Sequence, residues 1–200
     1  KRVRVKMMNQ TGKYSLLEEP DFQALALPYA GDALSMVVIL PRAADGLAAL
    51  EAALTPTALA GHLAMLDPMI RSEGKPTVVV GLPRFEATAA FSLGEVLVAM
   101  GMRDAFDETR ADFTGMNGAG PADPEALHIS AVVHKAWVKV DEQGTEAAAA
   151  TAVVMTARSA ATSPTPVFRA DHPFLFLIRD NGTGAILFLG RVIDPTPQGA

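Results

Sequence analysis

Residues 142–166 combine alanines and threonines with a single basic residue, Arg158. A backbone of such small residues can be extended, helical or disordered at little cost, so the segment suits a loop with several conformations. A structureless segment of this length in a compact domain is uncommon and is usually functional. Arginine fits a deep protease pocket with an acidic base, as in trypsin-like enzymes. Residues 142–166 are therefore a candidate functional loop.

A Ser-His-Asp hydrolase is the obvious enzyme rival. Serine, histidine and aspartate all occur in the sequence, but the Gly-x-Ser-x-Gly motif of many hydrolases does not. His62 and His128 are isolated, and no two histidines have the spacing of metal ligands. Residues 115–120 are rich in glycine, but they follow no clear strand and open no helix, unlike a phosphate-binding loop. We therefore expect a protein that is not an enzyme and needs no metal or other cofactor.

Two long motifs resemble the serpin family of serine protease inhibitors. Residues 142–152, Glu-Gln-Gly-Thr-Glu-Ala-Ala-Ala-Ala-Thr-Ala, are similar to the reactive-loop hinge of inhibitory serpins. Residues 168–178, Phe-Arg-Ala-Asp-His-Pro-Phe-Leu-Phe-Leu-Ile, are similar to the C-terminal serpin signature at every characteristic position. Residues 133–136 and 5–8 also fit, so the resemblance spans nearly the whole chain. It implies the serpin fold, an α+β fold with multi-stranded, largely antiparallel sheets and a few short helices.

The resemblance implies a suicide substrate for a serine protease. The protease cleaves the loop and stays covalently attached, while the freed loop inserts into the main sheet as a strand and distorts the enzyme. The family's spacing places the reactive bond after Arg158, between Arg158 and Ser159, which implies a trypsin-like target. The bond between Met155 and Thr156 is the alternative and would suit a chymotrypsin- or elastase-like protease. A third possibility is that Arg158 merely keeps the loop soluble.

The hinge has side chains that suit insertion into a sheet. Alternate residues of a strand face opposite sides, so the inserted strand would present one uniform face of small or modest side chains: Thr145, Ala147, Ala149, Thr151 and Val153. Glu146 has the opposite parity and could stay in solvent, and Gly144 gives the backbone freedom to turn. The expected hinge consists of Glu142, Gly144, Thr145, Glu146, Ala147, Ala148, Ala149, Ala150 and Thr151.

Three residues outside the loop gain a role only from the resemblance. His134 corresponds to the region where the main sheet opens, although a hydrogen-bonded core histidine is the simpler interpretation. Arg84, the basic residue after Pro83, corresponds to the partner of Glu142 at the top of the sheet. The alternative is that Arg84 and Glu142 are two separately solvated charges.

A serpin domain is considerably longer than this chain, so the resemblance is to its C-terminal half. We expect residues 1–200 to be that half of a single domain, residues 142–166 to be the reactive loop, and the N-terminal half to be absent. Lys1 is not an initiator methionine, and no signal peptide is visible. An extracellular or periplasmic location is inferred from the family alone. The alternatives are a non-inhibitory serpin, acting as a carrier or chaperone-like binding protein, and a fragment that is inactive on its own.

Composition excludes several other classes of protein. Half of the residues are hydrophobic and a fifth are charged, as in globular proteins. A net charge of -5 gives no reason to expect nucleic-acid binding, and no run approaches the roughly 18 apolar residues of a membrane span. The chain has no cysteine, which excludes disulfides and thiolate metal sites.

Hydrophobic patterns and turn residues predict many strands and few helices. The expected strands cover residues 3–8, 13–17, 22–27, 33–40, 127–140, 167–169, 174–179 and 185–193, with two more within residues 76–86 and turns at residues 10–12 and 180–184. The expected helices are one capped by Asp45 and running to Leu54, one from Pro56 to about Leu66, and one from a capping box at Ser92 to about Gly101. Residues 103–123 are expected to form a loop, and residues 171–173 a structural turn.

Overall fold

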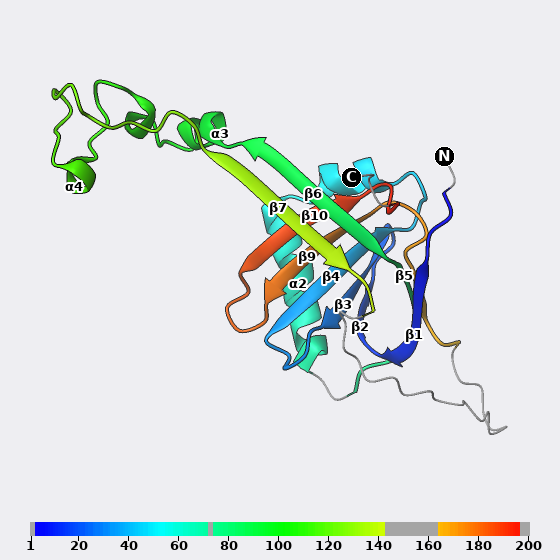
Figure 1. Cartoon of the computed structure of the whole chain (residues 1–200). Coiled ribbons are helices and arrows are strands. Elements are labelled where there is room, and N and C mark those ends of the chain that lie inside the picture. The colour runs from blue at the N-terminus through cyan, green and yellow to red at the C-terminus, as the bar shows by residue number, and fades with distance from the viewer. Residues whose placement is uncertain (1–2, 72–73, 143–163, 197–200) are drawn as a thin grey trace. The chain divides into compact units, whose positions relative to one another are not determined.

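A computed structural model describes residues 3–71, 74–142 and 164–196. These residues form two compact units, residues 1–86 with 139–200 and residues 87–138. Figure 1 shows the elements in chain order: β1 (Met7–Lys13), β2 (Ser15–Glu18), β3 (Phe22–Pro28), β4 (Leu34–Pro41), α1 (Leu47–Ala53), α2 (Pro56–Arg71), β5 (Thr77–Pro83), β6 (Phe85–Ser92), α3 (Gly94–Ala99), a 3-10 turn (Asp104–Phe106), α4 (Thr114–Asn117), β7 (Val133–Val140), β8 (Val167–Arg169), β9 (Phe174–Asp180) and β10 (Ile186–Val192).

The larger unit is built on a five-stranded antiparallel sheet with the strand order β10-β9-β4-β3-β2. The long apolar runs of β4 and β9 make these strands the interior of the sheet, as expected for strands buried on both faces. Leucines of α1 and α2 pack on one face, against alternate residues of β3, β4 and β9 such as Ala24, Val37 and Leu177. On β9 the alternate residues Phe174 and Phe176 contact Phe85, at ring-centroid distances of 5.7 and 5.2 Å.

A smaller three-stranded sheet has the order β1-β5-β8. The pairing of β1 with β5 is antiparallel, and that of β5 with β8 is parallel, from Val79 opposite Val167 to Gly81 opposite Arg169. The turn that follows β8 is tied to β4, because the ring nitrogen Nε2 of His172 lies 2.6 Å from the carbonyl oxygen of Pro41. Its Nδ1 lies 2.9 Å from a carboxylate oxygen of Asp171. Asp171 and His172 therefore have structural contacts, in agreement with the predicted turn.

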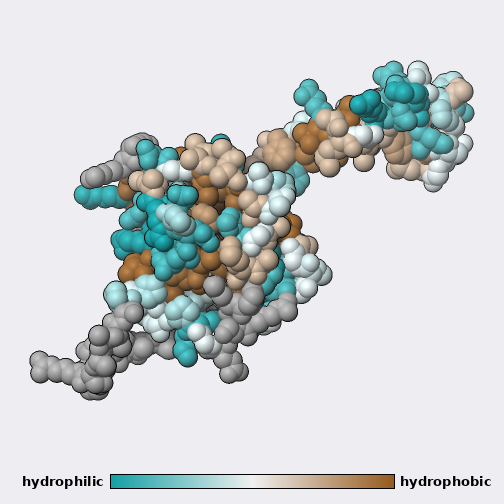
Figure 2. Space-filling model, turned by 180° about the vertical axis from the view of Figure 1, so that it is seen from behind, coloured by the Kyte–Doolittle hydropathy of each residue, from teal (hydrophilic) through white to brown (hydrophobic). Residues whose placement is uncertain are grey.

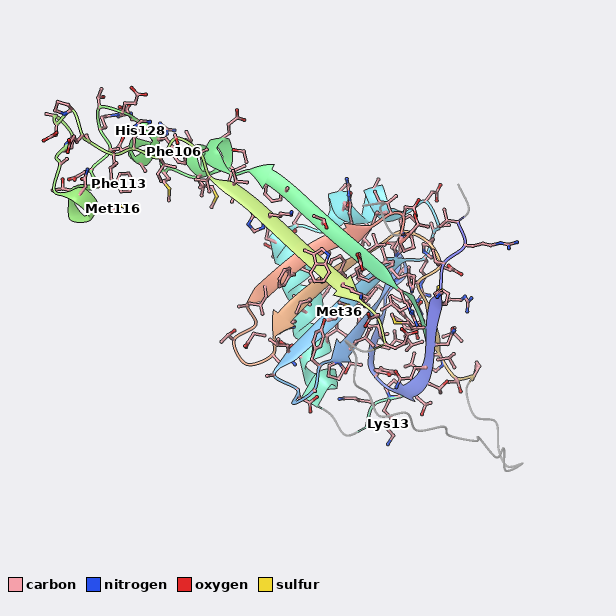
Figure 3. All side chains as sticks on the ribbon, in the orientation of Figure 1. Lys13, Met36, Phe106, Phe113, Met116 and His128 are labelled. Carbon is pink, nitrogen blue, oxygen red and sulfur yellow. The ribbon has the colours of Figure 1, made fainter. Side chains whose placement is uncertain are left out.

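The unit of residues 87–138 contains α3, the 3-10 turn and α4. Side chains that the sequence gave no special role, including Phe106, Phe113 and Met116, belong to it (Figure 3). Asp107 organises one of its turns by accepting hydrogen bonds from the hydroxyl and the backbone N–H of Thr109, which lower the pKa of that carboxyl to about 2. Met100 and Met116 are more than three-quarters exposed. Figure 2 shows both apolar and polar residues on the surface of the protein.

Several predicted elements are confirmed. The two strands predicted at residues 22–27 and 33–40 pair as β3 and β4, and the three strands after residue 166 are β8, β9 and β10. Pro83 separates β5 from β6, as predicted. At the start of α2, the hydroxyl of Thr55 accepts a hydrogen bond from the backbone N–H of Ala58 at 3.2 Å, as a helix cap should.

Other predictions about local structure are wrong. Residues 10–12 are not a turn, because they continue β1. A Cβ added at Gly12 would stand 3.0 Å from a ring carbon of Tyr14. Gly46 rather than Asp45 is the N-cap of α1, and no side chain caps it. Leu93 rather than Ser92 is the N-cap of α3, so no capping box forms.

Three further corrections concern the length of elements. Helix α2 continues through Pro68 to Arg71, so this proline does not end the helix as predicted. The predicted loop at residues 103–123 contains the 3-10 turn and α4. Strand β7 begins at Val133, since residues 127–132 pair with no strand among the described residues.

Within the described ranges no single helix is long and apolar enough to cross a membrane. Helix α1 and the first part of α2 reach that length and hydrophobicity only together, and the pair is bent by 98°.

Packing of Gly190 in β10 gives a first testable prediction. A Cβ at this position would stand 2.8 Å from two carbons of the Phe176 ring, and Phe176 is only 3% exposed. Because the buried ring has little room to shift, Gly190→Ala should lower the free energy of unfolding by about 1–3 kcal/mol. Gly61→Ala is the matched control in α2, where nothing lies within 4 Å of the new Cβ; it should raise that energy by about 0.5–1 kcal/mol. Urea unfolding of both variants measures the difference, and equal effects would contradict the packing argument.

Candidate functional site

The site begins where β7 ends. Val140 is buried at the end of the strand and fixes its position, and the next residues, Asp141 and Glu142, are partly or fully exposed. The ammonium of Lys139 lies 3.3 Å from a carboxylate oxygen of Asp141. Glu142 is the last described residue before residues 143–163, so its contacts define how the base of the predicted loop is held.

Arg84 lies between two buried residues. Pro83 ends β5 and Phe85 begins β6, and both are almost fully buried, so the intervening Arg84 side chain projects outward. Its Nη2 donates to Oε1 of Glu142 at 2.6 Å, and its Nε lies 2.6 Å from Oε2. Such a bidentate pair fixes the orientation of both groups. The structure thus brings Arg84 and Glu142 together, whereas their role in the loop's movement stays a prediction.

The pair changes the protonation of both groups. The hydrogen bond from Arg84 is the main reason why the pKa of the Glu142 carboxyl is lowered. The same hydrogen bond is the main cause of the raised pKa of the Arg84 guanidinium. Both side chains are about half exposed, so solvent and salt screen the attraction. The pair is therefore better suited to orienting the chain at Glu142 than to stabilising the whole fold.

This arrangement predicts a pH dependence. A carboxyl whose pKa is lower in the folded state contributes stability above its unfolded pKa and loses it as pH falls through the folded pKa. Arg84→Met should therefore lower the melting temperature slightly at neutral pH, and the difference from wild type should shrink as pH falls below about 4. Thermal unfolding between pH 7 and pH 3 measures it, with Arg103→Met as the control, because Arg103 is exposed and makes no ion pair with another described residue. A difference that stayed constant with pH would show that Arg84 acts through packing alone.

Most of the predicted loop residues lie outside the described residues. These are Gly144, Thr145, Glu146, Ala147, Ala148, Ala149, Ala150, Thr151, Arg158 and Ser159, together with the alternative bond at Met155. The described chain resumes at residue 164 and enters β8, which is held by its parallel pairing with β5. The structure therefore gives the two flanks of the loop, and the reactive bond stays a prediction.

His134 is exposed on β7, and its ring centroid lies 5.2 Å from that of Phe91 on β6. Among the described residues the ring lies on the surface beside an aromatic partner, and the simpler interpretation, a hydrogen-bonded core histidine, stays a prediction because its partners would lie in the N-terminal half of the domain. Its suggested part in opening the sheet stays a prediction. Among the described residues no group of three or more histidine, aspartate or glutamate side chains could hold a metal ion.

The fold and the flanks of the predicted loop can be compared with those of known protein families. The family model "Serpin (serine protease inhibitor)" matches residues 1–195, and the chain therefore belongs to the serpin family. It is 42% identical over 194 residues to an uncharacterized serpin-like protein of Thermococcus kodakarensis, covering 96% of this chain and 42% of that protein. It is 41% identical over 202 residues to human leukocyte elastase inhibitor, covering 97% of this chain and 50% of the inhibitor. The chain thus spans about half the length of the curated relatives it matches.

A solved structure supports the same assignment. The crystal structure of uncleaved ovalbumin matches with a TM-score of 0.71 and 31% sequence identity, over 96% of this chain and 44% of ovalbumin. The serpin fold predicted from the sequence, with largely antiparallel sheets and few helices, is confirmed. The family model describes serine protease inhibitors, and an inhibitor occurs among the relatives.

The predicted extracellular or periplasmic location is wrong. It was inferred from the family alone, but the curated relatives include leukocyte elastase inhibitor and serpins B6 and B8, which are intracellular proteins. Membership of the serpin family therefore gives no support for secretion of this chain.

Proposed function

We propose that the whole protein to which this chain belongs inhibits a trypsin-like serine protease as a suicide substrate. In this mechanism the protease attacks the bond between Arg158 and Ser159, forms a covalent acyl-enzyme, and is trapped when the cut loop inserts into the main sheet. The observation that carries the proposal is the hinge sequence from Glu142 to Thr151, whose small side chains permit insertion. The contact between Arg84 and Glu142 supports it, because it holds the base of the loop at the start of β6.

We also propose that residues 1–200 are the C-terminal part of a single serpin domain, and that the N-terminal part completes its sheets. Exposed apolar side chains support this division: Trp137 on β7 and Phe188 and Leu189 on β10 are all at least 40% exposed. A run of exposed apolar residues, such as Ile186 to Leu189 on β10, usually marks a surface that another part of the protein covers. By this proposal the 200-residue chain alone does not trap a protease, since the strand beside which the loop inserts is supplied by the other part.

The test is a mixture of the full-length protein with trypsin, analysed on a denaturing gel and by mass spectrometry. We expect a covalent complex that resists denaturation, with cleavage between Arg158 and Ser159. Clean cleavage without a complex would favour a non-inhibitory serpin that carries or binds another molecule. The chain of residues 1–200 by itself is the control, and an inhibitory, monomeric 200-residue chain would contradict the proposed division of the domain.

A further inference from the structure

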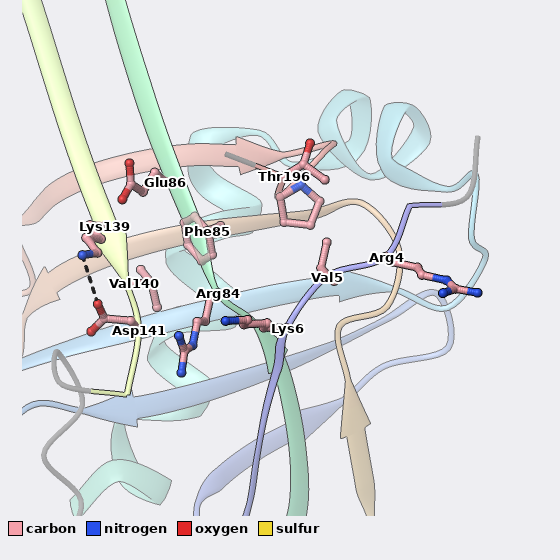
Figure 4. A pocket seen from close by; sticks show the side chains of 11 residues that line it. Arg4, Val5, Lys6, Arg84, Phe85, Glu86, Lys139, Val140, Asp141 and Thr196 are labelled. Atoms are coloured by element: carbon pink, nitrogen blue, oxygen red, sulfur yellow. Dashed lines mark ion pairs between the residues drawn. The ribbon is translucent and has the colours of Figure 1, made fainter. Parts of the chain in front are cut away.

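A hollow of about 380 Å³ lies within the larger unit, next to the contact between Arg84 and Glu142 (Figure 4). Four segments far apart in the sequence line it: residues 4–6, 84–86, 139–141 and 195–196. Its volume lies within the range of small-molecule sites, which are roughly 300–1,000 Å³. None of the residues predicted for the reactive loop belongs to its lining. Arg84, which lies outside that loop and was predicted as the partner of Glu142, does belong to it.

Apolar side chains form much of the wall. Phe85 is 3% exposed and Val140 is 7% exposed, so both are held rigidly by the core around them. Val5 and Pro195 add apolar surface from the N- and C-terminal segments. An apolar group placed against these four side chains would lose contact with water, which favours binding.

Two positive charges in the lining, those of Arg4 and Lys6, are not neutralised by the described residues. Of the basic side chains in the lining, Arg84 is paired with Glu142 and Lys139 with Asp141. Lys6 makes no ion pair with any described residue, and its backbone oxygen accepts the N–H of Arg84 at 3.0 Å. Figure 4 shows the Lys6 side chain directed toward the Arg84 guanidinium, while Arg4 points away from it. Arg84 alone binds the carboxylate of Glu142, so the neighbouring ammonium of Lys6 is available for a second anionic group.

We propose that this hollow binds a small apolar carboxylic acid, with its carboxylate on Lys6 and its apolar body against Phe85. The bidentate contact of Arg84 with Glu142 indicates that this rim already binds a carboxylate. Glu86 and Asp141 in the lining disfavour a second negative group on the ligand, so the site selects monoanions over dianions. The site is separate from the proposed reactive bond and does not depend on inhibition of a protease.

Benzoate is the probe, and benzamide is its neutral match in size and shape. Binding to the full-length protein is followed by NMR chemical-shift titration. Benzoate should bind saturably in the millimolar range, as expected for a ligand of so few atoms, and benzamide more weakly by about tenfold. Lys6→Met keeps most of the side-chain stem and should weaken benzoate by about tenfold without affecting benzamide. Lys13→Met is the control, because Lys13 lies at the other end of β1, remote from the hollow (Figure 3).

A second variant tests the charge argument in the opposite direction. Glu142→Gln removes the carboxylate that Arg84 holds, so benzoate should bind several-fold more tightly. Circular dichroism and thermal unfolding establish that each variant is folded before titration. The proposal is overturned if benzoate does not bind saturably, if benzamide binds as well as benzoate, or if Lys6→Met and Lys13→Met behave alike.

Discussion

Thr145→Arg should convert the full-length protein from an inhibitor of trypsin into a substrate. Thr145 is the first residue of the face that would be buried when the loop inserts as a strand. Insertion would form about ten new ladder hydrogen bonds, each worth roughly 1 kcal/mol, so it releases on the order of 10 kcal/mol. An arginine at the leading inward position must be buried without a partner, which costs several kcal/mol at the first step. Deacylation then outruns insertion, and the protease escapes.

The readout is the number of inhibitor molecules consumed for each protease trapped. We expect this number to rise by about a hundredfold or more, with the covalent complex absent from a denaturing gel. Glu146→Arg is the matched control, because residue 146 has the opposite parity and its side chain stays in solvent. Trapping by Thr145→Arg at the wild-type level would contradict the insertion mechanism, as would an equal loss in both variants.

Arg158→Ala should abolish rapid inhibition of trypsin. An arginine side chain entering a pocket with an acidic base forms a buried, hydrogen-bonded ion pair, and truncating such a partner costs about 2–5 kcal/mol. The rate constant of inhibition should therefore fall by about a hundredfold to a thousandfold. Arg158→Lys is the control that preserves the positive charge and should retain most of the activity.

The same variants separate the two possible reactive bonds. The rate constant of inhibition is measured with trypsin, chymotrypsin and elastase. Mass spectrometry of the released peptide then locates the cleaved bond. If wild type and Arg158→Ala inhibit equally, with cleavage after Met155, the reactive bond has been misplaced and the target is chymotrypsin- or elastase-like. The hinge would keep its role in that case, because insertion depends on residues before the cut.

The sequence predicted the strands of the larger sheet well, because long apolar runs such as those of β4 and β9 have few other stable arrangements. The predicted turn at residues 10–12 was wrong, because glycine and polar residues also occur within strands. Gly12 lies within β1 because a side chain there would crowd the ring of Tyr14, a contact that only the folded chain creates. Gly46 rather than Asp45 is the N-cap of α1, and a Cβ at Gly46 would stand 3.0 Å from the backbone oxygen of Ala43, a contact that only the folded chain creates.

The candidate site was predictable only in part. The contact between Arg84 and Glu142 was expected from the family resemblance and not from composition or periodicity, because the two residues lie far apart in the chain. Lys6 and the hollow beside it were not foreseen. Their lining comes from four separate segments, and only the register of β1 against β5, with the end of β7, brings these segments together.

The position of β9 in the five-stranded sheet has a consequence for any cut between residues 143 and 163. The polypeptide that follows such a cut contains β9, which is paired on both sides, with β4 and with β10. Of these neighbours, β4 belongs to the polypeptide before the cut, and the leucines of α1 and α2 pack across the same sheet. The two pieces would therefore remain one particle, held without a covalent link between them. Hydrolysis alters the connectivity of the molecule by adding one water across the cut bond, while the five-stranded sheet stays assembled.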